Sequence, residues 1–112
     1  RDSYRLVFNL VENAIRYSRP GSTVNVSICD NDSHVFLRVE DQGPGIPKQY
    51  RESIFQPFFR LDKSRSRAYG GAGLGLALVW EIAALHGGTA EVEASSKNGT
   101  TMLATLPKRT AA

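Results

Sequence analysis

The chain has 112 residues, of which 41% are hydrophobic and 22% charged, and its formal net charge is +3. This length and balance predict one small soluble globular domain over residues 1–112 and exclude a disordered chain. No apolar run is long enough to span a membrane, no signal peptide opens the sequence, and a single cysteine excludes an internal disulfide framework.

The first predicted element is a helix over residues 2–18, with Asp2 as its N-cap. A core-facing stripe at helical spacing is predicted for Leu6, Val7, Leu10, Val11, Ala14 and Ile15. Asn9 and Asn13 lie four residues apart and therefore share one face. Asparagine is a poor residue inside a helix because its amide competes for backbone hydrogen bonds, so the pair points to a function. An exposed polar face is the alternative.

Two strands follow and predict a hairpin with one buried face, since apolar and polar residues alternate in both. The apolar positions are Val24, Val26, Ile28, Val35, Leu37 and Val39. Cys29 follows Ile28 on the first strand and is predicted to be a packed thiol rather than a nucleophile.

A carboxylate and two glycines end this hairpin, in the run Asp41-Gln42-Gly43-Pro44-Gly45. A carboxylate accepts hydrogen bonds and donates none, so Asp41 suits an exocyclic amine such as adenine N6. The glycines let the backbone come close to a ligand. For this run alone, a capped turn is the alternative, because Asp and Gly are common in loops.

A short helix is predicted over residues 47–55, with Tyr50, Ile54 and Phe55 directed inward. Residues 56–69 have no clean periodicity, and their length predicts a lid or binding loop. The basic residues that cluster in this loop are Arg60, Lys63, Arg65 and Arg67. Nucleic acid is a minor option for them, since the chain has neither the aromatic runs of an RNA-binding sheet nor zinc-ligand spacing.

A glycine-rich run over residues 70–75 opens a helix predicted for residues 76–86. Helix N-termini favour phosphate, but neither the dinucleotide pattern nor the P-loop pattern fits this run, and a flexible hinge is the alternative. A last hairpin is predicted over residues 89–94 and 100–106, turning at Lys97-Asn98-Gly99. The order predicts an α+β fold, a two-layer α/β sandwich whose mixed, mostly antiparallel sheet is covered on one face by helices.

Three further residues are assigned structural roles. His34 starts a strand and His86 ends a helix, and no Ser/His/Asp set can be built from their spacing. Trp80, within the last helix, is predicted to lie in the core or at an interface.

Four of these segments stand in an order that resembles the catalytic ATP-binding domain of two-component sensor histidine kinases. They correspond to that family's N box (residues 9–17), G1 box (41–47), F box (54–60) and G2 box (70–76), with a lid over residues 57–72. The resemblance covers almost the whole chain and implies the Bergerat fold, which gyrase-type and Hsp90-type ATPases share.

The resemblance implies that the chain binds ATP and Mg²⁺. Asn13 would be the Mg²⁺ ligand, and Asn9 and Arg16 would act with it at the phosphates as the catalytic set. Tyr17 would pack near the nucleoside, and Asp41 would accept a hydrogen bond from adenine N6. The other nucleotide-binding positions implied are Gly43, Gly45, Ile46, Phe58, Arg60, Gly71, Gly73, Leu74, Gly75, Leu76, and Thr100 or Thr101.

The same resemblance implies phosphoryl transfer to a histidine on a separate dimerisation domain, which this sequence lacks. Neither His34 nor His86 lies in an acidic helical setting like that acceptor, so the expectation is ATP binding without autophosphorylation. Further implied partners are a response regulator receiver domain and a second copy of a longer protein, a membrane sensor whose cytoplasmic part includes this chain. The strand that usually precedes the first helix in the family is not recognisable here.

Two other functions remain open. A gyrase-type or Hsp90-type ATPase has a Glu four residues before the metal-binding Asn, where this chain has Asn9. A nucleotide-sensing module without turnover is the other alternative.

Overall fold

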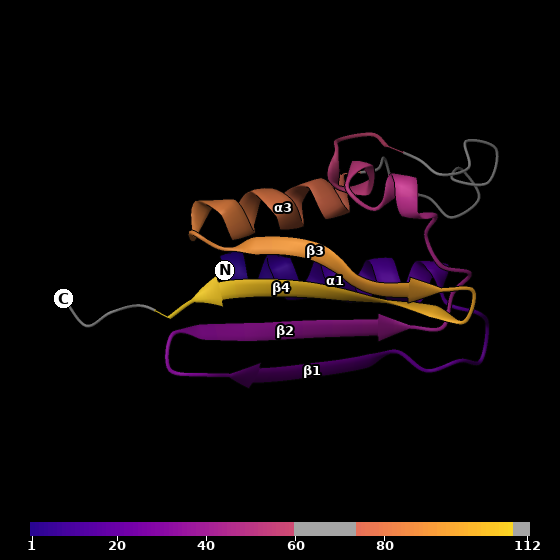
Figure 1. Cartoon of the computed structure of the whole chain (residues 1–112), viewed down its shortest axis with the longest axis horizontal. Helices are drawn as coiled ribbons and strands as arrows, with labels where there is room; N and C mark the ends of the chain where they lie inside the picture. Colours follow the sequence, from indigo (N-terminus) through magenta and orange to yellow (C-terminus); the bar gives the residue numbers. More distant parts are fainter. Residues whose placement is uncertain (60–73, 109–112) are drawn as a thin grey trace.

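The chain folds into a layer of helices packed on one face of a sheet, as described for residues 1–59 and 74–108 in a computed structural model (Figure 1). The elements in order are α1 (Asp2–Tyr17), β1 (Asn25–Asp30), β2 (His34–Asp41), the 3₁₀ turns η1 (Lys48–Tyr50) and η2 (Ser53–Phe55), α3 (Gly75–Leu85), β3 (Thr89–Ser96) and β4 (Gly99–Pro107). The predicted α+β sandwich is therefore confirmed. In the described part of the chain, no helix is both long and apolar enough to cross a membrane.

The four described strands pair in the order β1-β2-β4-β3, and every pairing is antiparallel. In this register Asp41, at the end of β2, lies opposite Thr100 at the start of β4, and Thr100 also lies opposite Ser95 near the end of β3. Residues far apart in the sequence thus meet at one end of the sheet.

The core lies between α1, α3 and the sheet. The predicted helical stripe is confirmed at Leu6, Leu10 and Ala14, which are buried, and Val7 and Val11 pack against the same core. Ile15 was predicted to face inward, but 62% of it is exposed. It lies about 100° round the helix from Ala14, beyond the edge of the buried stripe.

The prediction of a hairpin with one buried face holds for β2 but is wrong for β1. In β2 the face toward the helices is buried at Leu37 and Val39, as predicted. In β1, Val26 and Ile28 point to the same side but are 46% and 67% exposed, because β1 is an edge strand and α1 packs over β2. Alternation therefore identified the shared face, but α1 covers that face at β2 and leaves Val26 and Ile28 of β1 exposed.

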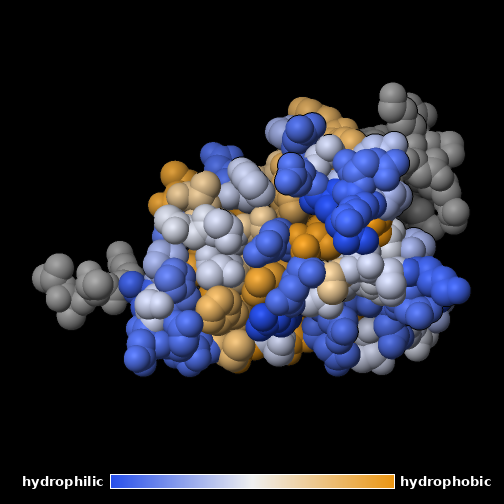
Figure 2. Space-filling view, viewed as in Figure 1, coloured by the Kyte–Doolittle hydropathy of each residue, from blue (hydrophilic) through white to orange (hydrophobic). Residues whose placement is uncertain are grey.

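The other face of the sheet carries polar pairs. Arg38 of β2 reaches Glu93 of β3 with two hydrogen bonds, from Nε to Oε1 at 2.7 Å and from Nη2 to Oε2 at 2.8 Å. Cys29 is exposed on this face, 3.6 Å from Arg38 Nη1, so the prediction of a packed thiol is wrong. Seen from this side, hydrophilic groups break the hydrophobic surface into small areas (Figure 2).

Three smaller expectations also change. Asp2 is the first helical residue and makes no capping bond; its Oδ2 lies 3.1 Å from Nε2 of His86 and joins the start of α1 to the end of α3. The short helix over residues 47–55 is two 3₁₀ turns, in which Ile54 and Phe55 are buried but Tyr50 is exposed. Trp80 is exposed and packs its ring at a tilt against Phe55, so it does not lie in the core, and the alternative of an interface stays a prediction.

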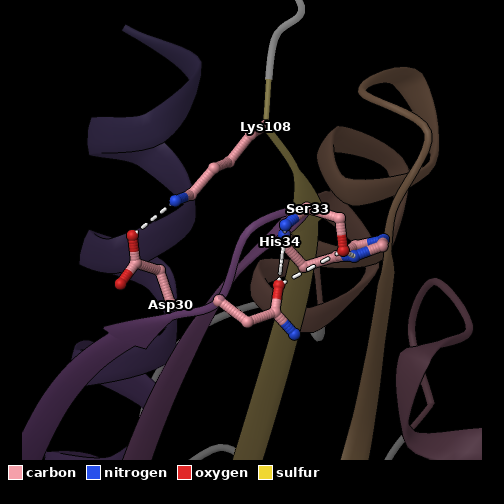
Figure 3. A network of polar contacts seen from close by, with 5 residues as sticks. Asp30, Ser33, His34 and Lys108 are labelled. Carbon is pink, nitrogen blue, oxygen red and sulfur yellow. Dashed lines mark hydrogen bonds and ion pairs between the residues drawn. The ribbon is translucent and has the colours of Figure 1, made fainter.

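The β1–β2 turn, whose polar contacts are drawn in Figure 3, lies at the opposite end of β2 from Asp41. Asn31 Oδ1 accepts hydrogen bonds from the backbone N–H of Ser33 at 2.9 Å and of His34 at 2.7 Å. Lys108, just after β4, pairs with Asp30 at 2.6 Å. His34 therefore belongs to a turn network at the opposite end of β2 from the glycine loop, in agreement with a structural role.

Candidate functional site

Asp41 is a carboxylic acid held inside the protein at the end of β2, with 6% of its surface exposed. Its Oδ1 accepts hydrogen bonds from the backbone N–H of Gly43 at 2.9 Å and of Thr100 at 3.2 Å. Burial raises the pKa of Asp41, the two backbone hydrogen bonds act to lower it, and nearby Glu40 adds a small upward contribution. The side chain is thus fixed in one orientation before any ligand binds.

The glycine loop packs too closely for larger residues. A Cβ at Gly43 would clash with the backbone oxygen of Tyr17, which brings the end of α1 against the loop. Gly45 has φ +88°, and a Cβ there would clash with the backbone oxygen of Ser96. Only glycine combines this left-handed conformation with such an approach.

Thr100 is the threonine that the fold brings to Asp41. It is buried, and its Oγ1 lies 2.8 Å from Ser95 Oγ, which also accepts a hydrogen bond from the N–H of Ile46 at 2.8 Å. Thr101 lies opposite Glu40, on the face of the sheet away from the helices. The sequence left Thr100 and Thr101 as alternatives, and the geometry joins only Thr100 to the carboxyl.

The two asparagines of α1 lie on one face that the start of α3 approaches. Both are half-buried, and a Cβ on Gly75 would lie 3.3 Å from Asn9 Oδ1. Asn9 Nδ2 donates to the backbone oxygen of Arg5 at 2.7 Å, and Arg16 lies 3.8 Å from Glu12. The predicted N box and the end of the predicted G2 box are therefore neighbours in space.

The remaining predicted positions are placed less fully. Phe58 is exposed and has a left-handed backbone with φ 65°, while Ile46 and Leu76 pack against the core and Leu74 is exposed. The other calls lie outside the described residues: Arg60, Gly71 and Gly73, most of the lid over 57–72, and the basic cluster.

Asn13 fits the kind of metal site in which phosphates supply most of the ligands. In residues 1–59 and 74–108, no group of three His, Cys, Asp or Glu residues could hold a metal ion. Magnesium keeps several waters and needs only one or two protein oxygens when it arrives with phosphates. The half-buried amide of Asn13 offers one such neutral oxygen.

Sequence reasoning missed three residues around the loop. Arg19 donates from Nη1 to the Gln42 oxygen and from Nη2 to the Lys97 oxygen, both at 2.9 Å. Arg51 donates from Nε to the Ile46 oxygen and from Nη2 to the Ser95 oxygen, both at 3.1 Å. The pairing of Ser95 with Thr100 could have been read from the hairpin turn at residues 97–99, but the arginine contacts have no local signal.

Comparison with known proteins decides the family. Residues 1–110 match the family described as histidine kinase-, DNA gyrase B- and HSP90-like ATPases. The chain belongs to this family. The resemblance expected from the four boxes is confirmed.

Relatives within the family are sensor kinases. The chain is 46% identical over 99 residues to the sensor-like histidine kinase SenX3 of Mycobacterium tuberculosis H37Rv, covering 88% of this chain and 24% of that protein. It is 48% identical over 95 residues to the sensor protein RstB of Escherichia coli K12, covering 85% of this chain and 22% of that protein. The chain therefore spans about a quarter of the length of these two relatives.

Solved structures agree in fold. The mycobacterial sensor histidine kinase MprB superposes with a TM-score of 0.79 at 39% identity, covering 94% of this chain and 69% of that one. Full-length ShkA in complex with AMPPNP gives a TM-score of 0.84 at 29% identity, covering 99% of this chain and 22% of that one. The chain corresponds to the ATPase-type catalytic part of these kinases.

Proposed function

We propose that this chain binds Mg²⁺-ATP and donates the γ-phosphoryl group to a histidine on a separate dimerisation domain. The bond from the γ-phosphorus to the leaving ADP oxygen breaks, and a bond to the acceptor ring nitrogen forms. Such transfer needs mainly positioning and charge stabilisation, so the chain's task is to hold the nucleotide in place.

The observation that carries the proposal is the buried, oriented carboxyl of Asp41. Both backbone donors reach Oδ1, and within the described residues this leaves Oδ2 to accept from a ligand amine. Adenine offers an N–H at N6, whereas guanine presents an oxygen at the equivalent position, which an ionised carboxylate disfavours. The base would thus be chosen at the Asp41 end of the sheet.

The phosphates would lie along the asparagine face of α1, near the start of α3. Asn9 and Asn13 would bind there, with Arg16 supplying positive charge, and Gly75 lets α3 approach this face. Asn13 would hold Mg²⁺, which when bound neutralises charge on the phosphate oxygens. The roles proposed for Arg60, Gly71 and Gly73 in the lid follow from the family resemblance alone.

An ATPase of the gyrase or Hsp90 type is the second candidate, and Asn9 argues against it. Hydrolysis needs a general base to activate water, and a neutral amide cannot take that proton. The amide of Asn9 also donates to the Arg5 oxygen, so its nitrogen is already engaged within the helix. A kinase that passes the phosphoryl group to an external histidine needs no base at this position.

The wider setting is proposed from the family resemblance. We propose that the chain works inside a longer homodimeric membrane sensor, on the cytoplasmic side, and that a response regulator receiver domain takes the phosphoryl group from the histidine. His34 begins β2 and hydrogen-bonds to Asn31 of the β1–β2 turn, and His86 contacts Asp2, so neither is proposed as the acceptor.

Calorimetric titration with AMPPNP, with and without Mg²⁺, tests the binding half of the proposal. We expect binding that strengthens with Mg²⁺ and exceeds the binding of a guanine analogue. Equal affinity for both purines would contradict the proposed role of Asp41.

Incubation with labelled ATP and a dimerisation domain of a related kinase tests the transfer half. We expect acid-labile label on the histidine domain, no label on this chain alone and slow release of free phosphate. Tight binding without label transfer would favour the nucleotide-sensing module, and rapid phosphate release would favour the ATPase.

A further inference from the structure

Two arginines hold the ends of the loop at residues 42–46. Arg19 bridges the oxygens of Gln42 and Lys97, and Arg51 bridges the oxygens of Ile46 and Ser95. In each case one guanidinium joins the loop to the β3–β4 hairpin. Both ends of the loop are therefore bound to the β3–β4 hairpin.

Between these two contacts the loop and the hairpin pack without space between their backbones. A Cβ on Gly45 would clash with the backbone oxygen of Ser96, and a Cβ on Gly99 would clash with the backbone oxygen of Asp41. Hydrogen bonds to carbonyl oxygens from a charged donor are among the stronger ones in proteins. The arginines thus stabilise a close contact that the glycines allow.

A chain of polar contacts leads from this contact to Asp41. The N–H of Ile46 donates to Ser95 Oγ, Ser95 Oγ lies 2.8 Å from Thr100 Oγ1, and the Thr100 N–H donates to Asp41 Oδ1. Arg51 contacts both residues at the outer end of this chain. Movement of Ile46 or Ser95 would therefore shift the carboxyl of Asp41.

We propose that Arg19 and Arg51 are positioning residues that hold the 42–46 loop against the β3–β4 hairpin and so fix Asp41 for the selection of adenine. This inference rests on the proposed function for its ligand. It assigns the two guanidinium groups to the base end of the site. Two nitrogens of each guanidinium donate to backbone oxygens, one in the loop and one in the hairpin, which assigns the arginines to the purine pocket.

The test compares adenosine, AMPPNP and a guanine analogue on the whole chain. In Arg19→Gln and Arg51→Gln, we expect the Kd for AMPPNP to rise about tenfold, as for the loss of charge-assisted hydrogen bonds. The Kd for adenosine should rise by the same factor, and the preference for adenine over guanine should fall. Arg16→Gln, proposed to act on phosphate, should weaken AMPPNP binding and leave adenosine binding unchanged.

Arg38→Gln is the matched control. It removes the same charge and a two-bond ion pair with Glu93, on the face of the sheet away from the helices. We expect it to lower the melting temperature and to leave both nucleoside affinity and purine preference unchanged. If Arg38→Gln reduces adenine preference as Arg51→Gln does, the effect is general destabilisation and the inference is wrong.

Amide hydrogen exchange separates this inference from the proposed function. The N–H groups of Gly43, Ile46 and Thr100 are hydrogen-bonded in the loop contact, so they should exchange faster in the Arg19 and Arg51 variants without any nucleotide. Arg51→Lys, which can reach only one oxygen at a time, should give an intermediate rate. Unchanged exchange overturns the inference, whereas faster exchange in a chain that binds no adenine would overturn only the proposed function.

Discussion

The backbone N–H of Thr100 donates a hydrogen bond to Oδ1 of Asp41 at 3.2 Å, and this contact joins the first residues of β4 to the last residue of β2 inside the protein. The N–H of Gly43 shares the same oxygen. The protein thus uses one carboxylate oxygen to orient the group and presents the other.

Asp41→Asn should reverse the purine preference while the fold persists. The amide oxygen can accept both backbone hydrogen bonds, which places the NH₂ group where Oδ2 was. A donor would then face the N6 amine of adenine, so the binding free energy of AMPPNP should weaken by about 1–3 kcal/mol. A guanine analogue, which presents an oxygen there, should bind more tightly. Calorimetry with both analogues measures the change.

Asp41→Ala is the companion variant for that experiment. It leaves the N–H groups of Gly43 and Thr100 without their acceptor, so it should destabilise the protein as well as abolish purine preference. A preference for adenine that survives in Asp41→Asn would show that another group selects the base.

Stability should also depend on the ionisation of Asp41. Because burial raises its pKa in the folded protein, the folded chain binds the proton more tightly than the unfolded chain, whose value is near 3.8. The protonated Asp41 carboxyl contributes its full stabilisation below pH 3.8, and this stabilisation is lost as the pH rises through the pKa of Asp41 in the folded protein. Urea unfolding should therefore show the free energy of unfolding of Asp41→Asn rising relative to that of the original protein as the pH rises. A difference between the two proteins that stays constant with pH would contradict this assignment.

Gly45→Ala and Gly21→Ala separate backbone strain from loop contact. Both glycines have positive φ, +88° and +79°, so the left-handed backbone alone should cost each alanine about 1–2 kcal/mol of folding free energy. A Cβ at Gly21 meets no atom within 4 Å, whereas at Gly45 it clashes with the Ser96 oxygen. Thermal melts should show both losses, but only Gly45→Ala should lose adenosine binding. Equal binding in the two variants would mean that loop position is unimportant.

Much of the helix and of the carboxyl site could be predicted because local spacing determines it. Positions four apart in α1 share a face whatever surrounds them, which placed Leu6 and Leu10 in the core and Asn9 beside Asn13. A polar residue that ends an alternating strand marks the end of the sheet, and Asp41 lies there.

The burial of β1 and the arginine contacts could not be predicted, because they depend on which segments pack together in the folded chain. Alternation put Val26 and Ile28 on one face of β1 but could not tell that α1 packs over β2. Arg19 reaches Lys97 across 78 positions in the sequence, and Arg51 reaches Ser95 across 44. Long arginine side chains carry no periodicity that indicates such contacts, so only the folded chain reveals them.

Asn13→Ala should remove the strengthening of AMPPNP binding by Mg²⁺ and leave adenosine binding unchanged. Asn13 is half-buried in the middle of α1, and alanine is a better helix former, so the melting temperature should not fall. Glu12→Ala is the control, because it removes the neighbouring carboxylate, which lies near Arg16 about 100° round the helix from Asn13. Titrations with and without Mg²⁺ should show the metal effect intact in Glu12→Ala. A metal effect lost there and kept in Asn13→Ala would assign the ion to the carboxylate.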